Sequence, residues 1–198
     1  MEKDTRHLTP SVEREVRTKR KINCCDRAAR TRSSRLRRLE GSAFATISRN
    51  DRKKGEVYGY DGGKKVKGRK RHIVVDSQGL IVGALVTEGN TPERLGAAMV
   101  ILEHQEELSD TEVIWVDGGY SGQNFARVVR QICGASVEVV KRTSKTFKIL
   151  PKRWMVERTF GWLNRYRRLS KDYETHVENS EAMIYGSLIR LMIRRFAL

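Results

Sequence analysis

Residues 113–120 read Val-Ile-Trp-Val-Asp-Gly-Gly-Tyr, and this stretch indicates the fold class. Val113–Val116 is an apolar run with the length of a buried strand, and Asp117 ends it. In an open α/β sheet, a carboxylate at the carboxyl end of a strand points into the crevice where ligands bind. Asp117 is therefore a candidate functional residue. A plain Asp-Gly turn or a helix cap is the alternative interpretation.

The segments on either side alternate between strand and helix patterns. His72–Asp76 and Leu80–Thr87 flank a Ser-Gln-Gly turn signal, which predicts a β-hairpin. Thr91 followed by Pro92 predicts a helix start with Thr91 as the N-cap. Further predictions are a helix around 125–132, a strand at 137–140, and helices at about 151–168 and 179–196. This order is typical of a mixed α/β sheet flanked by helices.

Glu157 is a second candidate, on the predicted helix that follows the last strand. Arg153 lies four residues before it and shares its face, so an ordinary ion pair is the alternative. Two carboxylates from separate elements of a basic protein indicate a divalent ion with hard oxygen ligands, Mg²⁺ or Mn²⁺. Such ions activate a water or a 3′-hydroxyl for phosphoryl transfer. We expect a third carboxylate beside them.

The charge of the chain points to a polyanionic partner. The 198 residues include 40 Lys and Arg against 24 Asp and Glu, a formal net charge of +16, and nucleic acid is the usual partner of so basic a protein. Residues 1–54 carry +10 of this and hold no apolar periodicity, so they predict a disordered or irregular leader. The apolar runs are too short for a membrane span, and no signal peptide is visible. We expect a cytoplasmic protein.

A run of basic residues at 62–71 is the clearest candidate for DNA contact. Its cations are Lys64, Lys65, Lys67, Arg69, Lys70 and Arg71. Interspersed glycines allow the backbone to approach a phosphate. The alternative is a solvated edge strand protected by lysines.

Four ordered motifs resemble the transposases of bacterial insertion sequences, of the DDE class and the grouping around the fifth insertion sequence. They read Gly-Tyr-Asp-Gly-Gly-Lys-Lys-Val-Lys-Gly-Arg-Lys-Arg-His at 59–72, Trp-Val-Asp-Gly-Gly-Tyr at 115–120, Val-Glu-Arg-Thr-Phe-Gly-Trp-Leu at 156–163 and Arg-Leu-Ser-Lys-Asp-Tyr-Glu at 168–174. The resemblance covers about residues 55–198.

This resemblance implies an RNase H-like catalytic domain that uses Mg²⁺ or Mn²⁺ to cut transposon ends and transfer the strands into target DNA, with a homodimer as one arrangement. It implies that Asp117 and Glu157 are the second and third catalytic acids and metal ligands. It adds Arg153, Arg158 and Arg165 to the DNA-binding candidates. Two family positions differ, since a tyrosine is replaced by Leu150 and a lysine by Asn164.

The first acid of the family has no match. The family carries it just upstream of residue 59 in an Asp-Ser-Gln-Ser-Val-Lys type motif, where this chain reads Phe44 to Lys54, with Asp51 too close to the next motif. One possible set of codons for Ala45–Lys54, when read one nucleotide later, encodes Gln-Ser-Val-Glu-Thr-Thr-Glu-Lys. This peptide resembles the family's motif. We therefore hypothesise that residues 1 to about 54 are translated out of frame.

These observations divide the chain into the 1–54 leader and a partial catalytic domain at 55–198. We expect an RNase H-like sheet that is incomplete at its N-terminal strand, in an inactive copy of a transposase. A non-catalytic basic DNA-binding protein is the alternative.

Overall fold

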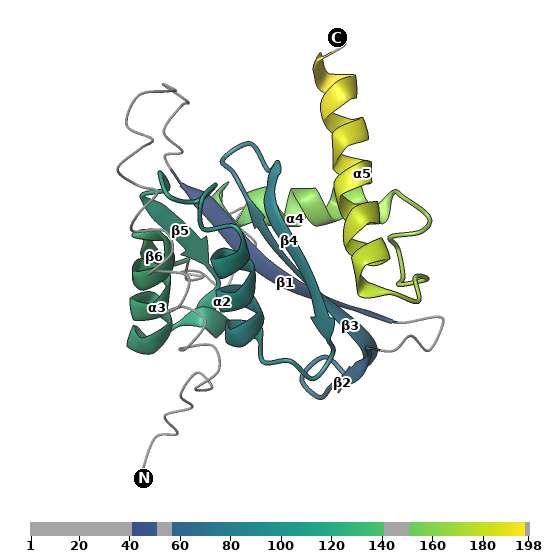
Figure 1. The fold of residues 1–198 in the computed structure, drawn as a ribbon, viewed down its shortest axis with the longest axis horizontal. Coiled ribbons are helices and arrows are strands. Elements are labelled where there is room, and N and C mark those ends of the chain that lie inside the picture. Colours follow the sequence, from purple (N-terminus) through teal and green to yellow (C-terminus); the bar gives the residue numbers. More distant parts are fainter. Residues whose placement is uncertain (1–40, 51–56, 141–150, 197–198) are drawn as a thin grey trace, which may run out of the picture. The chain divides into compact units, whose positions relative to one another are not determined.

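The computed structural model describes residues 41–50, 57–140 and 151–196, and their core is a six-stranded mixed sheet (Figure 1). The strands are β1 (Ser42–Asn50), β2 (Gly59–Asp61), β3 (Val66–Val75), β4 (Ile81–Glu88), β5 (Val113–Val116) and β6 (Ser136–Val139). The predicted hairpin is confirmed as β3 and β4. Asp76 closes its turn by accepting the backbone N–H groups of Gln78 and Leu80, each at 2.8 Å.

The pairing of the strands matches an RNase H-like fold. β4, β3 and β1 are neighbours and antiparallel, whereas β5 runs parallel to β1, and β6 runs parallel to β5. The short β2 continues the row of β4 by pairing with the start of β3. The predicted α/β class, with a mixed sheet flanked by helices, is therefore confirmed.

Strand β1 corrects the expectation that the sheet lacks its N-terminal strand. Residues 42–50, which we had assigned to an irregular leader, pair with β3 along most of their length and with β5 at their start. Ala43 and Phe44 face opposite sides of the sheet, and both are buried. The strand forms because both of its faces are covered and small or apolar side chains fit there. The catalytic aspartate of the family is not needed for this pairing. Residues 1–40 and 51–56 lie outside the described part.

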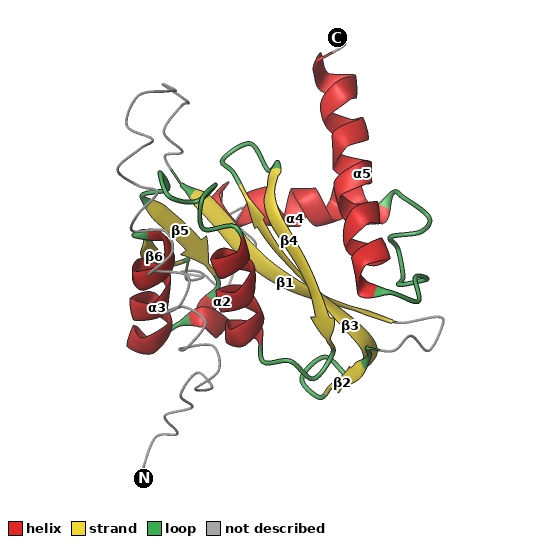
Figure 2. Ribbon diagram, viewed as in Figure 1, coloured by secondary structure: helices red, strands yellow, loops and turns green. Residues whose placement is uncertain are grey.

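Helices cover both faces of the sheet (Figure 2). They are α2 (Glu93–Glu103), α3 (Gln123–Cys133), α4 (Pro151–Asn164) and α5 (Val177–Phe196), with a 3₁₀ turn, η1 (Gly118–Tyr120). One core contains Phe44, Val74 and residues of α2 and α3, and the other contains Ala43, Ile73 and residues of α4 and α5. No helix in the described ranges has the length and apolar character needed to cross a membrane.

The start of α2 differs from its prediction by one residue. Pro92 occupies the capping position in an extended conformation, and no side chain caps the helix. The prediction of Thr91 as the N-cap was therefore wrong. The Thr91 backbone is engaged elsewhere, because its N–H donates to Glu88 and its carbonyl accepts Lys70 Nζ at 2.8 Å.

Helix α5 closes the outer edge of β4. The backbone N–H of Ala84 donates to the Tyr185 hydroxyl at 2.9 Å, and that of Val86 donates to Glu181 Oε1 at 2.7 Å. Glu181 and Tyr185 are one helical turn apart, so they face the same strand. Burial raises the pKa of the Glu181 carboxyl, which the Val86 N–H partly offsets.

Candidate active site

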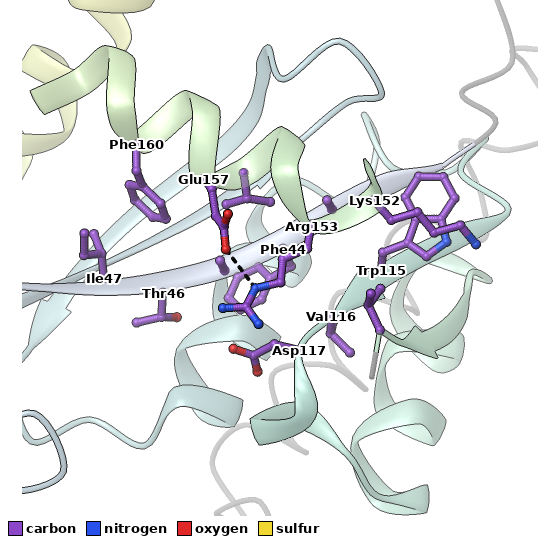
Figure 3. A pocket seen from close by; sticks show the side chains of 14 residues that line it. Phe44, Thr46, Ile47, Trp115, Val116, Asp117, Lys152, Arg153, Glu157 and Phe160 are labelled. Carbon is purple, nitrogen blue, oxygen red and sulfur yellow. Dashed lines mark ion pairs between the residues drawn. The ribbon is translucent and has the colours of Figure 1, made fainter. Parts of the chain in front are cut away.

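A pocket of about 170 Å³ lies where β1, the end of β5 and α4 meet. Its walls are β1 residues 43–47, residues 115–117 and side chains of α4 that include Arg153 and Glu157 (Figure 3). Ala43 pairs with Trp115 in the parallel β1–β5 ladder. The two candidate acids therefore do meet at one site, although they are 40 residues apart in the chain.

Asp117 both lines the pocket and caps a turn. Its Oδ1 accepts the backbone N–H of Gly119 at 2.9 Å and so begins η1. The site and the cap were alternative interpretations of this residue, and the geometry combines them. A Cβ at Gly119 would lie 3.1 Å from this carboxylate oxygen, so the glycine keeps the loop close to it.

Glu157 is paired within its own helix. Its Oε1 lies 2.9 Å from Arg153 Nε, and the two side chains are about half exposed, at 52% and 46%. Figure 3 shows the Arg153 guanidinium extending from α4 into the space between Glu157 and Asp117. An arginine in this position neutralises carboxylates that would otherwise attract a cation.

Strand β1 contributes no acid to the pocket. Its lining residues are Ala43, Phe44, Ala45, Thr46 and Ile47. No group of three or more metal-ligating side chains occurs among the described residues. Since two metal ions need a shared carboxylate and flanking ones, the residues present do not fit a two-metal centre. Asp51 lies outside the described residues.

The comparisons with known proteins agree with this geometry. A family model described as Transposase DDE domain matches residues 43–192. The chain belongs to the DDE transposase family. The match includes residues 43–50 of β1, Asp117, Glu157 and α4.

Two individual proteins resemble this transposase. A Burkholderia cepacia protein, named for a transposase of insertion sequence element IS402, is 28% identical over 131 residues, which are 63% of this chain. The match spans 60% of that relative. The catalytic core domain of BIV integrase has a TM-score of 0.46 and 14% identity, covering 76% of this chain and 82% of the integrase chain.

Three of the predicted DNA-binding residues are buried. Arg69, Lys70 and Arg71 are 0%, 5% and 2% exposed, because β3 is an interior strand and not the edge strand that we considered. Direct contact of these three with DNA is therefore not supported. Lys64, Lys65, Lys67, Arg153 and Arg165 are exposed, and Arg158 is half-buried with an N–H donated to the Gln78 carbonyl.

The buried arginines connect β3 to the segment between α4 and α5. Arg69 donates to the carbonyls of Glu174 and Thr175 at 2.9 and 2.6 Å, and Arg71 donates to that of Leu169 at 2.7 Å. Asp172 lies 3.7 Å from Arg69 and 3.8 Å from Arg71. Burial lowers the pKa of Arg71 to about 10, and the Asp172 carboxylate opposes this.

Asn164, which stands where the family has a lysine, also has a structural partner. Its side-chain oxygen accepts Arg49 Nη2, which joins the end of α4 to β1. The other family departure, Leu150, lies outside the described residues.

Glu93 is a carboxylate that sequence reasoning missed. It is the first residue of α2, and its Oε1 accepts Lys64 Nζ at 2.8 Å. Its Oε2 would be 3.6 Å from a Cβ at Gly119, so it lies beside the loop that Asp117 caps. The residues around it signalled only a helix start, and nothing in the sequence indicated its position relative to Asp117.

His72 supports strand β1 beneath the pocket. Its Nδ1 lies 2.7 Å from Thr46 Oγ1 and its Nε2 2.8 Å from Thr87 Oγ1. The Tyr120 hydroxyl donates to the same Thr46 oxygen at 2.8 Å. Burial, with smaller contributions from Lys70 and Lys64, lowers the pKa of His72 to about 3. The imidazole is therefore neutral and holds the middle of β1 in place.

Proposed function

We propose that this DDE transposase domain binds DNA around its pocket but does not cut it. The observation that carries this proposal is the lining of β1, where five consecutive pocket residues include no carboxylate. The exposed cations Lys64, Lys65, Lys67, Arg153 and Arg165, with the half-buried Arg158, are the proposed phosphate contacts.

Intact members of this class are expected to hold Mg²⁺ or Mn²⁺, with Asp117 and Glu157 as the matching ligands. When bound, such an ion polarises the phosphoryl group and activates the attacking oxygen. Here Arg153 is paired with Glu157, and β1 supplies no third acid. We therefore assign this chain no step that needs the metal.

The loss of the acid has a proposed origin in the reading frame. We propose that codons up to about residue 54 are read out of frame, so that β1 keeps its backbone but not its functional side chain. A strand tolerates the replacement of single side chains, because its formation depends on the pattern of apolar side chains on its two faces. The test is the gene itself, since the absence of a family-like reading in the shifted frame over codons 20–54 would refute the idea.

DNA binding without cleavage is tested by measuring both activities on one preparation. We expect the affinity for duplex DNA to fall steeply as salt rises, with a smaller salt slope after Lys64→Ala, Lys65→Ala and Lys67→Ala. We expect no strand cleavage on transposon ends of related elements in Mg²⁺ or Mn²⁺. Metal-dependent cleavage that Asp117→Ala abolishes would show that the site is complete.

A non-catalytic basic DNA-binding protein of other descent was the alternative. Because the chain belongs to the DDE transposase family, a protein of unrelated descent is excluded. DNA binding without cleavage remains the activity that we propose. Its phosphate contacts are now limited to exposed cations, since Arg69, Lys70 and Arg71 are buried. A cytoplasmic location and a homodimer remain parts of the proposal, and size-exclusion chromatography with light scattering tests the second.

A further inference from the structure

Strand β2 and the residue just before it expose two aromatic rings. Tyr58 and Tyr60 are 38% and 56% exposed, and they are among the few large apolar side chains of the described residues that face solvent. They are two residues apart in extended chain, so they lie on the same side. Two exposed aromatic rings side by side form a small apolar patch, and such patches are candidate binding surfaces.

Basic side chains surround these rings. Lys67 is the direct cross-strand partner of Tyr60, and its Nζ lies 5.4 Å from the centroid of the Tyr58 ring. Lys65, also exposed, is in the turn just before it, with a positive φ of 52°. A patch that combines aromatic faces with ammonium groups matches the chemistry of unpaired nucleic-acid bases and their phosphates.

The turn between β2 and β3, which lies beside these rings, is held in place by Asp61. Asp61 accepts the backbone N–H groups of Gly63 and Lys64 through Oδ1 at 3.0 and 3.2 Å. Through Oδ2 it accepts the hydroxyl of Ser48 on β1 at 2.6 Å, and Lys70 Nζ lies 3.4 Å away. The platform is therefore positioned before any ligand arrives, which reduces the entropy cost of binding.

Glycines explain why the rings face outward. A Cβ at Gly59 would lie 2.3 Å from Asn90 Oδ1, and one at Gly89 would lie 2.6 Å from the Gly59 carbonyl oxygen. The β2 side that carries Gly59 is therefore pressed against the 89–90 loop. Since side chains alternate along a strand, Tyr58 and Tyr60 are directed away from this contact.

The platform lies on the same face of the sheet as the pocket. Lys67 and Ile73 are six residues apart on β3 and share a face, and Ile73 pairs directly with the pocket residue Ala45. At about 3.3 Å per residue, the rings and the pocket are about 20 Å apart along the strand. Arg69 and Arg71, which lie between them on the same face, are covered by the segment between α4 and α5, so the rings form a surface separate from the pocket.

We propose that Tyr58 and Tyr60, with Lys65 and Lys67, form a stacking platform for the bases of single-stranded DNA. Stacking uses the π face that every base has, so the site would be tolerant of sequence. Bases within a duplex are already stacked on each other and are not available to the rings. The inference rests on the proposed DNA binding and adds the form of DNA that this surface takes.

The test uses the full 198-residue chain and two fluorescent probes, an oligothymidine of about 12 nucleotides and a duplex of the same length. We expect the double variant Tyr58→Ala and Tyr60→Ala to bind the single strand about 5- to 150-fold more weakly for each base that stacks. Binding of the duplex should be unchanged. The double variant Tyr58→Phe and Tyr60→Phe keeps both rings and should bind like the original chain.

Trp154→Ala removes another exposed aromatic, at 45% exposure on α4, and is the matched control. It should leave single-strand binding intact. Equal single-strand affinity of the alanine variant and the original chain would overturn the inference, and so would loss of binding in the phenylalanine variant. If the original chain binds the duplex alone, DNA binding stands and the platform is refuted. If it binds neither probe, both proposals fail.

Discussion

Arg153 Nε lies 2.9 Å from Glu157 Oε1, so this glutamate is paired with a cation from its own helix. The guanidinium extends toward Asp117 (Figure 3). A guanidinium group has no free electron pair that could bind a metal ion, and its positive charge repels the ion. The paired guanidinium therefore opposes the binding of a divalent cation at Glu157.

Replacement of Ala45 by aspartate should create a metal site. Ala43 pairs with Trp115, so Ala45 and Asp117 lie two residues further along neighbouring strands. Ala45→Asp would add the missing carboxylate to the two present. We expect measurable Mn²⁺ binding by electron paramagnetic resonance, and its loss when Asp117→Ala is added.

Thr46→Asp is the control, because the Thr46 side chain, although it borders the pocket, is already bonded to His72 and Tyr120. It should bind no Mn²⁺. Equal binding in both variants would mean that the ion is held by something other than the pocket carboxylates.

Loss of Asp172 should strongly destabilise the fold. This carboxylate is fully buried and faces both Arg69 and Arg71. Asp172→Ala leaves two buried guanidinium groups without their counter-ion, which costs about 3–5 kcal/mol. Urea denaturation should show a lower midpoint with a similar slope.

Glu138→Ala provides the comparison, because its ion pair with Lys152 is exposed. It should cost far less than Asp172→Ala, because solvent screens an exposed ion pair. Similar losses in the two variants would contradict the structural role of the buried cluster.

Gly96 should be intolerant of any side chain. A Cβ there would lie 2.1 Å from Cε1 of the buried His72 ring, so Gly96→Ala must displace α2 or the imidazole. We expect a loss of about 1–3 kcal/mol, the range of overpacked cores, measured as a lower thermal midpoint.

Gly161 and Gly186 also lie in helices, but no atom is within 4 Å of a Cβ built on either. Alanine at these positions should raise stability by up to about 1 kcal/mol through helix propensity. The prediction would be refuted if Gly161→Ala lowered the thermal midpoint while Gly96→Ala left it unchanged.

Stability should fall in mild acid because of His72. Its pKa is about 3 in the folded protein against an ordinary value near 6.5, so the unfolded chain binds the proton more readily. The contribution is complete above about pH 6.5 and is lost as pH falls toward 3, by up to about 1.4 kcal/mol per pH unit.

Denaturation series at several pH values check this, with His72→Gln as the reference that cannot titrate in that range. The difference in stability between the two proteins should narrow or reverse as pH falls. A constant difference between pH 7 and pH 4 would refute a neutral buried imidazole.

Local signals in the sequence were sufficient for the hairpin and for strand β5. Asp117 could be proposed as a site residue because it ends an apolar strand, whereas the local pattern around Glu157 favours an ordinary ion pair with Arg153. Their meeting in one pocket followed from the family resemblance. Its details, such as the placement of Arg153 between them, depend on side-chain rotamers.

Strand β1 was missed for a physical reason. Its second half, Ser48-Arg49-Asn50, reads as polar chain, yet these residues pair with β3 through backbone groups. Such pairing depends on a partner about 20 residues later, and the partner leaves no trace in local composition. The buried arginines were misjudged similarly, since charge predicts exposure unless distant carbonyls satisfy the guanidinium groups.

The contact of Glu181 and Tyr185 with β4 predicts how a chain that ends before α5 would behave. The two side chains occupy backbone donors that would otherwise offer a template to another polypeptide. A copy shortened before α5 would expose this row of donors and become prone to aggregation. The domain therefore depends on its last helix to keep this row of backbone donors covered.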